Sequence, residues 1–416
     1  MKRLALLASL LVACADAQPS PEAEPPLTTL ARRAEALRGE LVDLRRDLHR
    51  HPELSGEESR TEQVIAGKLA KLGLEVRTGV GGHGVIGVLR GGKPGPVVAY
   101  RSDMDAMPGE EPPGREYGST NPGVYHVCGH DVHMAVAVGV ASTLSSLREQ
   151  LPGTVLFLFQ PAEERLVGAQ AMIDAGAIDA PHPDVIYAIH SFPFPVGTLA
   201  HGAAFAGLDH ISVELLGSAA TEETALRVEE RLNELSNVTV PKNAEQVAAY
   251  LEALQVEGGP LSQAVYVDLG RSSDPNRVII RGGIKASSDK DYPALREQVQ
   301  HILEEEAGPA GYKLESKPFP SMVSDPEVSA AAAPELARAV GPDNVLKLHN
   351  VHAFSGEDFA LFLQRAPGAM FLLGVANPER GILGAPHFPD FDADEEAIQV
   401  GTRAMSQLIW QRLSQP

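Results

Sequence analysis

The chain has 416 residues, of which 44% are hydrophobic and 22% charged. This composition excludes a largely disordered protein and supplies a large core for two or three domains. The 35 basic and 55 acidic side chains give a formal charge of −20, which repels nucleic acid and anionic lipid headgroups, so we expect no nucleic-acid partner.

The N-terminus has the pattern of a signal peptide, residues 1–13. Two basic residues precede an apolar run over residues 4–13, which is too short to span a bilayer. Residues 11–14 resemble a bacterial lipobox, in which a lipid is attached to Cys14, and residues 14–29 have the composition of a flexible tether. We therefore expect export to the periplasm or cell envelope, with this lipid as the membrane anchor. The alternative is ordinary cleavage shortly after Cys14, with no lipid.

The cysteine content excludes an internal disulfide. Apart from Cys14, the only cysteine is Cys128. We expect the protein to derive its stability from its core, and the lone Cys128 thiol to be either buried or bound to a metal.

The first predicted elements lead to a pair of aspartates. Apolar spacing predicts helices at residues 31–49 and 59–72 and strands at residues 84–89 and 96–100. Asp103 and Asp105 follow the second strand directly. In open α/β sheets the carboxyl edge of the strands is where ligands bind.

The next stretch places more polar side chains at equivalent positions. It reads as a helix at 131–150, a strand at 154–160, a helix at 167–175 and a strand at 185–189. Cys128-Gly-His130 precedes the first of these helices, whose N-terminus we expect to lower the thiol pKa. The Glu163-Glu164 pair follows one strand and His190 ends the other.

A different pattern interrupts this alternation. Residues 208–317 read as a smaller α+β domain with a four-stranded antiparallel sheet, and residues 318–416 then return to the first pattern. We therefore predict an α/β domain formed by residues 30–207 and 318–416. It contains a mixed, mostly parallel sheet with helices on both faces, and the smaller domain interrupts it as a lid.

Sulfur, nitrogen and oxygen donors recur along the large domain. They are Cys128, His130, the Glu163-Glu164 pair, His190 and His387. Such a set suffices for two divalent ions and fits zinc, manganese or cobalt. Each signal is weak alone, because a cysteine is often simply buried and a histidine often belongs to a core or a surface loop. Their common position at one sheet edge favours a hydrolase with a paired metal centre.

The two aspartates have separate expected roles. If the strand continues through them, Asp103 and Asp105 point to opposite faces, so at most one faces the metals. We expect Asp105 to be that residue, supporting a ligating imidazole from behind. His133, three residues after His130, is expected in the same cleft.

Six segments together resemble the aminoacylase-type di-metal amidohydrolases, in particular the hippurate hydrolase and indole-acetyl-amino-acid hydrolase branch of the glutamate-carboxypeptidase-like peptidases. The segments are Arg46-Asp-Leu-His-Arg-His51-Pro-Glu-Leu-Ser-Gly-Glu57, Arg101-Ser-Asp-Met-Asp-Ala-Met-Pro108, Cys128-Gly-His-Asp-Val-His133, Gln160-Pro-Ala-Glu-Glu164, Gly356-Glu-Asp-Phe359 and Pro386-His-Phe388. The resemblance covers residues 30–205 and 320–412 in family order.

The resemblance implies a function for each candidate residue. The metal ligands it implies are Cys128, His130, Glu164, His190 and His387. Glu163 becomes the general base that activates water for attack on the amide bond of an N-acyl amino acid or short peptide. A lid of this family often mediates homodimerisation.

The lid departs from that family in one respect. The family's first lid strand runs into a Gly-Gly-His-Ala segment whose histidine stabilises the oxyanion, whereas residues 214–221 here contain no histidine. Loss of an oxyanion donor typically lowers turnover by about 100- to 1000-fold. Either another group substitutes or the enzyme is slow.

Three functions therefore stay open. The first is a working amidohydrolase, for which Phe192, Phe194 and Phe354 are candidate walls of an acyl pocket. The second is a metal-binding lipoprotein with little turnover, although such a protein has no need for Glu163. The third is a cysteine hydrolase using Cys128, which leaves the other metal-type donors unexplained.

Overall fold

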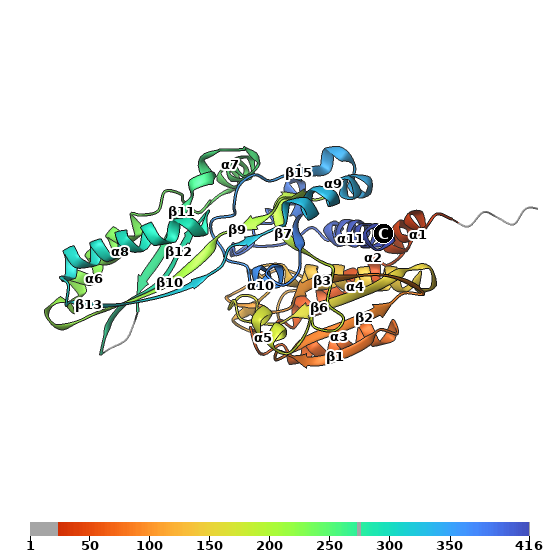
Figure 1. Ribbon diagram of the computed structural model, residues 1–416, viewed down its shortest axis with the longest axis horizontal. Helices are drawn as coiled ribbons and strands as arrows, with labels where there is room; N and C mark the ends of the chain where they lie inside the picture. Colours follow the sequence, from red (N-terminus) through yellow and green to blue (C-terminus); the bar gives the residue numbers. More distant parts are fainter. Residues whose placement is uncertain (1–23, 273–275, 416) are drawn as a thin grey trace, which may run out of the picture.

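The computed structural model describes residues 24–272 and 276–415. The predicted signal peptide, Cys14 and most of the tether lie outside these ranges. Within the described ranges, no helix is both long and apolar enough to cross a membrane. The chain forms a large domain and a smaller lid that projects from it (Figure 1).

An eight-stranded mixed sheet forms the centre of the large domain, which we call the catalytic domain. Its strands in spatial order are β1 (Glu75–Val80), β2 (Gly84–Arg90), β6 (Pro152–Gln160), β3 (Lys93–Asp103), β7 (Val185–Pro195), β16 (Gly368–Ala376), β8 (Leu199–His201) and β15 (Val345–Lys347). The central run β6-β3-β7-β16 is parallel, whereas β1, β2 and β8 introduce antiparallel pairs. The parallel strands therefore bring their carboxyl ends to one edge.

Helices cover both faces of this sheet. One face packs against α1 (Pro26–Ala36), α2 (Arg38–Arg50), α3 (Ser59–Lys71), α4 (His130–Ser145), α9 (Pro326–Val340) and α11 (Glu396–Ser414). The other packs against α5 (Gly168–Asp174), α7 (Ala244–Gln255) and α10 (Phe359–Leu363). Two short ribbons, β4 (Met107–Pro108) with β5 (Val124–Tyr125) and β9 (Ala204–Phe205) with β14 (Met322–Val323), complete the domain.

The lid has its own core. Its antiparallel sheet contains β11 (Val265–Arg271), β12 (Val278–Ala286), β10 (Gly207–Leu215) and β13 (Tyr312–Phe319), in that order. Helices α6 (Glu222–Asn233) and α8 (Tyr292–Ala307) contribute side chains to the same apolar cluster as this sheet. The predicted fold class, a mixed α/β domain with a separate four-stranded antiparallel sheet, is confirmed.

Helix α7 belongs to the lid in sequence but not in packing. Its buried residues Val247, Leu251 and Leu254 join the apolar cluster of the catalytic domain. Asn243 caps its start by accepting a hydrogen bond from the Gln246 N–H. The segment between α6 and β11 thus reaches back from the lid to the catalytic domain.

Two predicted elements differ from those observed, and strand β1 was missed. The helix expected over residues 31–49 is broken at Leu37, two residues before Gly39, a poor helix former in the first turn of α2. Strand β7 continues past residue 189 to Pro195, so His190 lies within the strand. Strand β1 was not predicted, because its mostly exposed residues lack a buried alternating pattern.

Candidate metal centre and active site

The candidate ligands come from four segments that end at the same edge of the large sheet. Cys128 and His130 flank the start of α4, Glu164 follows β6, His190 lies on β7, and His387 lies in the loop between β16 and α11. Gly129 adopts φ 89°, and a Cβ there would lie 2.8 Å from the Ser191 Oγ atom. Glycine therefore allows the turn that places Cys128 and His130 against β7.

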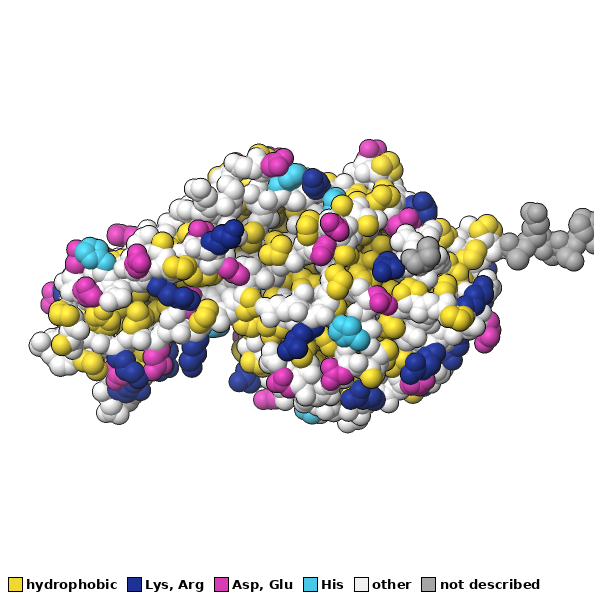
Figure 2. All heavy atoms as spheres, in the orientation of Figure 1, with side chains coloured by type: hydrophobic (Ala, Val, Ile, Leu, Met, Phe, Trp, Pro, Cys, Tyr) yellow, Lys and Arg dark blue, Asp and Glu magenta, His cyan; other side chains and the backbone are white. Residues whose placement is uncertain are grey.

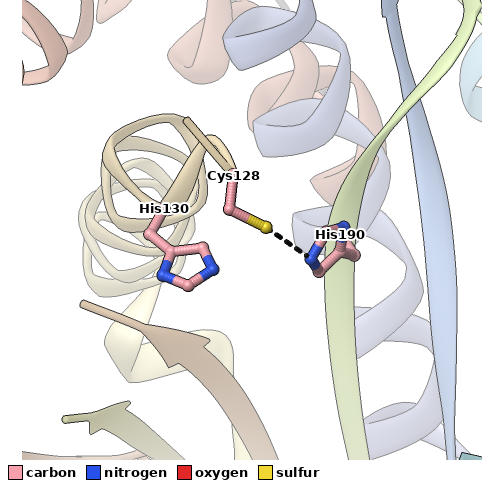
Figure 3. Close-up of side chains that lie close together, drawn as sticks. All are labelled: Cys128, His130 and His190. Atoms are coloured by element: carbon pink, nitrogen blue, oxygen red, sulfur yellow. Dashed lines mark hydrogen bonds between the residues drawn. The ribbon is translucent and has the colours of Figure 1, made fainter. Parts of the chain in front are cut away.

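Cys128 lies between two sets of donors. Its Sγ atom is 3.4 Å from Nε2 of His190 and 3.3 Å from Nε2 of His387. Figure 3 shows the thiol between the His130 and His190 rings. Cys128, His130 and His190 form one group whose ligand atoms lie within 4.8 Å of each other, and Cys128, Glu164 and His387 form a second. The shared sulfur makes these two adjacent three-ligand sites.

The ring nitrogens are oriented as metal binding requires. His130 Nδ1–H donates to the Asp105 carbonyl oxygen at 2.8 Å, and His190 Nδ1–H donates to the Ser191 carbonyl oxygen at 2.8 Å. Both Nε2 lone pairs therefore face the site. His130 Nε2 and Glu164 Oε1 are buried without a hydrogen-bond partner in the described chain and lie 3.7 Å apart. A buried imidazole nitrogen and a buried carboxylate oxygen that lack hydrogen-bond partners are suitable ligands for divalent ions.

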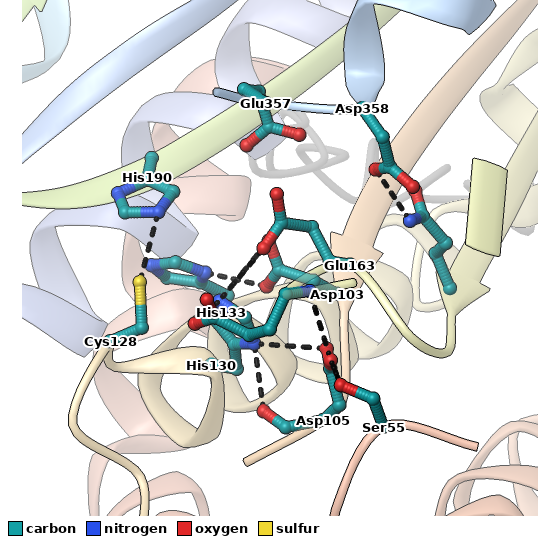
Figure 4. Close-up of polar contacts among 12 residues, drawn as sticks. Ser55, Asp103, Asp105, Cys128, His130, His133, Glu163, His190, Glu357 and Asp358 are labelled. Carbon is teal, nitrogen blue, oxygen red and sulfur yellow. Dashed lines mark hydrogen bonds and ion pairs between the residues drawn. The ribbon is translucent and has the colours of Figure 1, made fainter. Parts of the chain in front are cut away.

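Asp105 lies behind the candidate ligands. Its Oδ1 is 3.3 Å from His130 Nδ1, while its Oδ2 accepts hydrogen bonds from the Ser55 hydroxyl at 2.6 Å and the Glu164 N–H at 3.0 Å. One carboxylate thus touches His130 and Ser55 (Figure 4). It also touches the backbone of Glu164.

The expectation that at most one of Asp103 and Asp105 faces the site is wrong. Asp103 Oδ1 accepts from His133 Nδ1–H at 2.7 Å, and its Oδ2 lies 3.8 Å from His130 Nε2. Strand β3 ends at Asp103, so strict alternation does not extend to Asp105. His133 lies in this cluster, and its Nε2 accepts a hydrogen bond from the Ser191 N–H at 2.7 Å.

Glu163 lies in a buried acidic cluster with Glu357 and Asp358. Burial raises the pKa of Glu163 well above its ordinary value, and the neighbouring carboxylates act in the same direction. Arg101 holds the cluster together through ion pairs of 2.9 Å to Glu357 and 3.2 Å to Asp358. Arg101, Glu357 and Asp358 could be recognised in the sequence only as parts of motifs, because no local pattern shows that they contact each other.

The expected low thiol pKa is also wrong. Burial raises the pKa of Cys128 well above its ordinary value, and the carboxylates of Glu164 and Glu163 reinforce that shift. These effects outweigh the dipole of α4. A buried thiol whose pKa is raised is by itself a poor nucleophile, which argues against the cysteine-hydrolase hypothesis, whereas as a metal ligand it would lose its proton to the cation.

A cleft of about 700 Å³ opens over the candidate ligands between the two domains. Phe192 and Phe354 line it, whereas Phe194 lies behind Phe192 with a ring-centroid distance of 5.5 Å. The lid contributes side chains that include Tyr266, Asp268 and Lys285, on β11 and β12, and the imidazole of His210, on β10. These residues were not predicted to line the cleft, since the sequence does not show which lid strands meet it.

The lid segment that lacks the family histidine lies elsewhere. The described cleft lining contains no residue from 214–221. This segment therefore lies outside the cleft.

Fold and site together define a metal-dependent hydrolase. The profile of the peptidase family M20/M25/M40 matches residues 99–411, and the chain belongs to this family. A probable hydrolase of Synechocystis is 34% identical over 91% of this chain and 97% of its own length. An N-acetylcysteine deacetylase of Bacillus subtilis is 29% identical over 88% and 95%. The structure of Bacillus subtilis YXEP, described as a dinuclear metal-binding peptidase, matches with a TM-score of 0.69 and 28% identity, covering 91% of this chain and 99% of that one.

Proposed function

We propose that this chain hydrolyses the amide bond of N-acyl amino acids or short peptides. The observation that carries the proposal is the pair of three-ligand sites that share Cys128 and lie beside the buried carboxylate of Glu163. The relatives named above include a deacetylase that acts on an N-acyl amino acid.

The residues present fit two divalent ions. Cys128, His130 and His190 would hold one, and Cys128, Glu164 and His387 the other. When bound, such ions polarise the amide carbonyl and acidify water. The side chains fit zinc, manganese or cobalt, since thiolate, imidazole and carboxylate ligands occur with each of these metals.

Glu163 carries the proton through the reaction. Water adds to the amide carbon while Glu163 accepts its proton, and the carbonyl π electrons move to oxygen. The C–N bond then breaks, and Glu163 returns the proton to the departing nitrogen. The acidic cluster with Glu357 and Asp358 raises the pKa of Glu163, which favours its taking up a proton.

The cleft also suits a substrate with a carboxylate and an apolar acyl group. Lys285 lies 5.2 Å above the Tyr266 ring, and no described carboxylate lies within ion-pair distance of its Nζ atom. Burial lowers the pKa of Lys285, a shift that a bound substrate carboxylate would oppose. Phe192 and Phe354 offer the apolar wall.

The test combines metal analysis with hydrolysis. We expect about two ions per chain by elemental analysis and chelator-sensitive release of amino acid from a panel of N-acyl amino acids and dipeptides. Reconstitution with zinc, manganese or cobalt then identifies the active metal.

Glu163→Gln separates the proposed functions. We expect it to retain the metals but to lower kcat by about 100- to 10,000-fold. Metal binding without release across the panel would favour the ligand-binding alternative. A protein that binds no metal would overturn the proposal.

A further inference from the structure

One imidazole of the cleft that is not a candidate metal ligand is held in a fixed orientation by a residue of α7. His352 lies in the loop between β15 and α10, lines the cleft, and has no role in the steps above. Its ring packs against four aromatic rings. The centroid distances are 5.2 Å to Phe205, 5.3 Å to Phe192, 5.8 Å to Tyr250 and 5.8 Å to Phe354.

The backbone of His352 is fixed as well. Its N–H donates to the Ala204 carbonyl at 2.8 Å, and its carbonyl accepts from the Ala206 N–H at 2.9 Å. Between these two residues, the Phe205 ring lies 5.8 Å from the ring of the candidate ligand His190. His352 is thus anchored to the strand segment that packs against the metal centre.

The hydrogen bonds of the Tyr250 hydroxyl favour one tautomer of the His352 ring. The Tyr250 oxygen accepts the Ala353 N–H at 3.2 Å and lies 2.9 Å from His352 Nδ1. The hydroxyl satisfies both contacts when its own proton is donated to Nδ1. The proton of a neutral ring is then on Nε2. Burial lowers the pKa of His352 to about 3, so the ring is neutral at ordinary pH.

His352 Nε2 is available to a ligand. It makes no hydrogen bond with the described residues, and it is absent from their fully buried unpartnered atoms. It therefore keeps access to the cleft that the residue lines. The result is a neutral N–H donor whose ring and backbone are both held in place, the property required of a group that stabilises developing charge.

We propose that His352 Nε2–H donates a hydrogen bond to the scissile carbonyl oxygen as it becomes an oxyanion, and that Tyr250 is the positioning residue that fixes this tautomer. The inference rests on the proposed amide hydrolysis. His352 transfers no proton: the negative charge develops on oxygen when water adds, and it is lost when the C–N bond breaks.

Other donors in the cleft are less suited to this role, because the imidazole of His210, like Lys285, belongs to the lid. Lys285 is a flexible cation on the lid and better matched to the carboxylate of a substrate. Residues 217–221 do not line the cleft. His352 belongs to the catalytic domain, so a donor placed there needs neither lid movement nor a second copy of the chain.

The first experiment compares substitutions of His352. We expect His352→Phe to lower kcat by about 100- to 1000-fold while KM changes less than about threefold. His352→Gln keeps an N–H donor and should recover at least about tenfold of that loss. His349→Phe, an exposed histidine of the same loop, is the matched control and should leave kcat within about twofold. Metal content and melting temperature are measured for every variant.

A binding measurement distinguishes the oxyanion from the ground-state carbonyl. A phosphinate analogue of the N-acyl amino acid mimics the tetrahedral state, and His352→Phe should weaken its inhibition by about 100-fold. The substrate Kd, measured in the Glu163→Gln background, should change less than about threefold. Equal weakening of both would show that His352 binds the ground state and would overturn the proposal.

Tyr250 is tested by removing only its hydroxyl. We expect Tyr250→Phe to lower kcat by about tenfold, whereas Tyr187→Phe, in the other core of the catalytic domain, leaves it unchanged. Nitrogen-15 NMR of the His352 ring should show the proton on Nε2 in the wild type. A proton on Nδ1, or a His352→Phe enzyme with wild-type kcat, would refute the inference. A wild type without hydrolysis would instead refute the proposed function itself.

Discussion

In the catalytic domain, Arg45 and Arg101 are fully buried with their carboxylate partners. Arg45 lies 2.6 Å from Asp131, and Arg101 lies 2.7 Å from Asp103, with all four side chains at 0% exposure. In the lid, Arg231 and Arg271 form pairs of similar length but stay 37% and 40% exposed. Figure 2 shows acidic and basic side chains scattered over the lid surface.

This contrast separates two uses of charge. A buried ion pair costs desolvation free energy and is therefore poor evidence for stability, but it fixes the orientation of its members. Asp131 follows the candidate ligand His130 on α4, and Asp103 contacts both His130 and His133. The buried charges orient the site, whereas the exposed lid pairs keep their surface soluble and contribute little free energy.

The largest expected effect is the loss of Arg101. Arg101→Met leaves Asp103, Glu357 and Asp358 without their buried cation. We expect the free energy of unfolding to fall by about 3–5 kcal/mol, measured by urea denaturation. A loss below about 1 kcal/mol would show that these carboxylates are neutral or hydrated, and that burial is not the relevant difference between the domains.

The stabilisation by a partly buried carboxylate of the catalytic domain, Glu111, should depend on pH. Burial raises the pKa of Glu111, but His49, Arg115 and the Ser119 N–H outweigh burial and lower this pKa to about 2. The folded protein therefore binds this proton less readily than the unfolded chain. The resulting stability, roughly 3 kcal/mol, is complete above about pH 4.5 and is lost as pH falls toward 2.

Urea denaturation of the wild type and Glu111→Gln at several pH values measures this contribution. The difference between the two proteins should be largest near pH 6 and should shrink below pH 4.5. If the difference in the free energy of unfolding between the two proteins does not change with pH, the charge of Glu111 contributes nothing and only its packing matters.

Asp105 is expected to affect metal binding more than folding. Asp105→Asn weakens the support of His130 and should lower metal affinity by about 10- to 100-fold, as measured by competition with a chelator. Ser55→Ala removes only one hydrogen bond to Asp105 and should have a smaller effect in the same direction. Unchanged affinity in both variants would show that the His130 orientation does not depend on this carboxylate.

The smallest effect is expected in the lid. Arg271→Ala removes exposed pairs with Glu222 and Glu229. The free energy of unfolding should change by less than about 1 kcal/mol, and less still at high salt. A loss comparable with that of Arg101→Met would remove the distinction between the two domains.

The sequence predicted the parts of this molecule that depend on local pattern. Donors that follow strands or start a helix were placed at one sheet edge, and the lid sheet was recognised from its strand order. Long-range partners could not be read in the same way. Arg101 meets Glu357 across 256 positions, and Tyr250 meets His352 across 102. Neither contact can be recognised from a periodic pattern in the sequence, because both contacts depend on how separate elements pack in the folded protein.

The route of the chain through the lid has a consequence for folding. Parallel partners β7 and β16 stand on opposite sides of the lid in sequence, so their pairing must close a long loop, which costs entropy and slows folding. The lid begins and ends on neighbouring strands, with Leu208 opposite Phe319. Once the lid has folded, the chain leaves and re-enters the catalytic domain at adjacent points, and the loop that remains is short. A lid that folds first would therefore act as an internal clasp, because it shortens the loop that the interrupted sheet has to close.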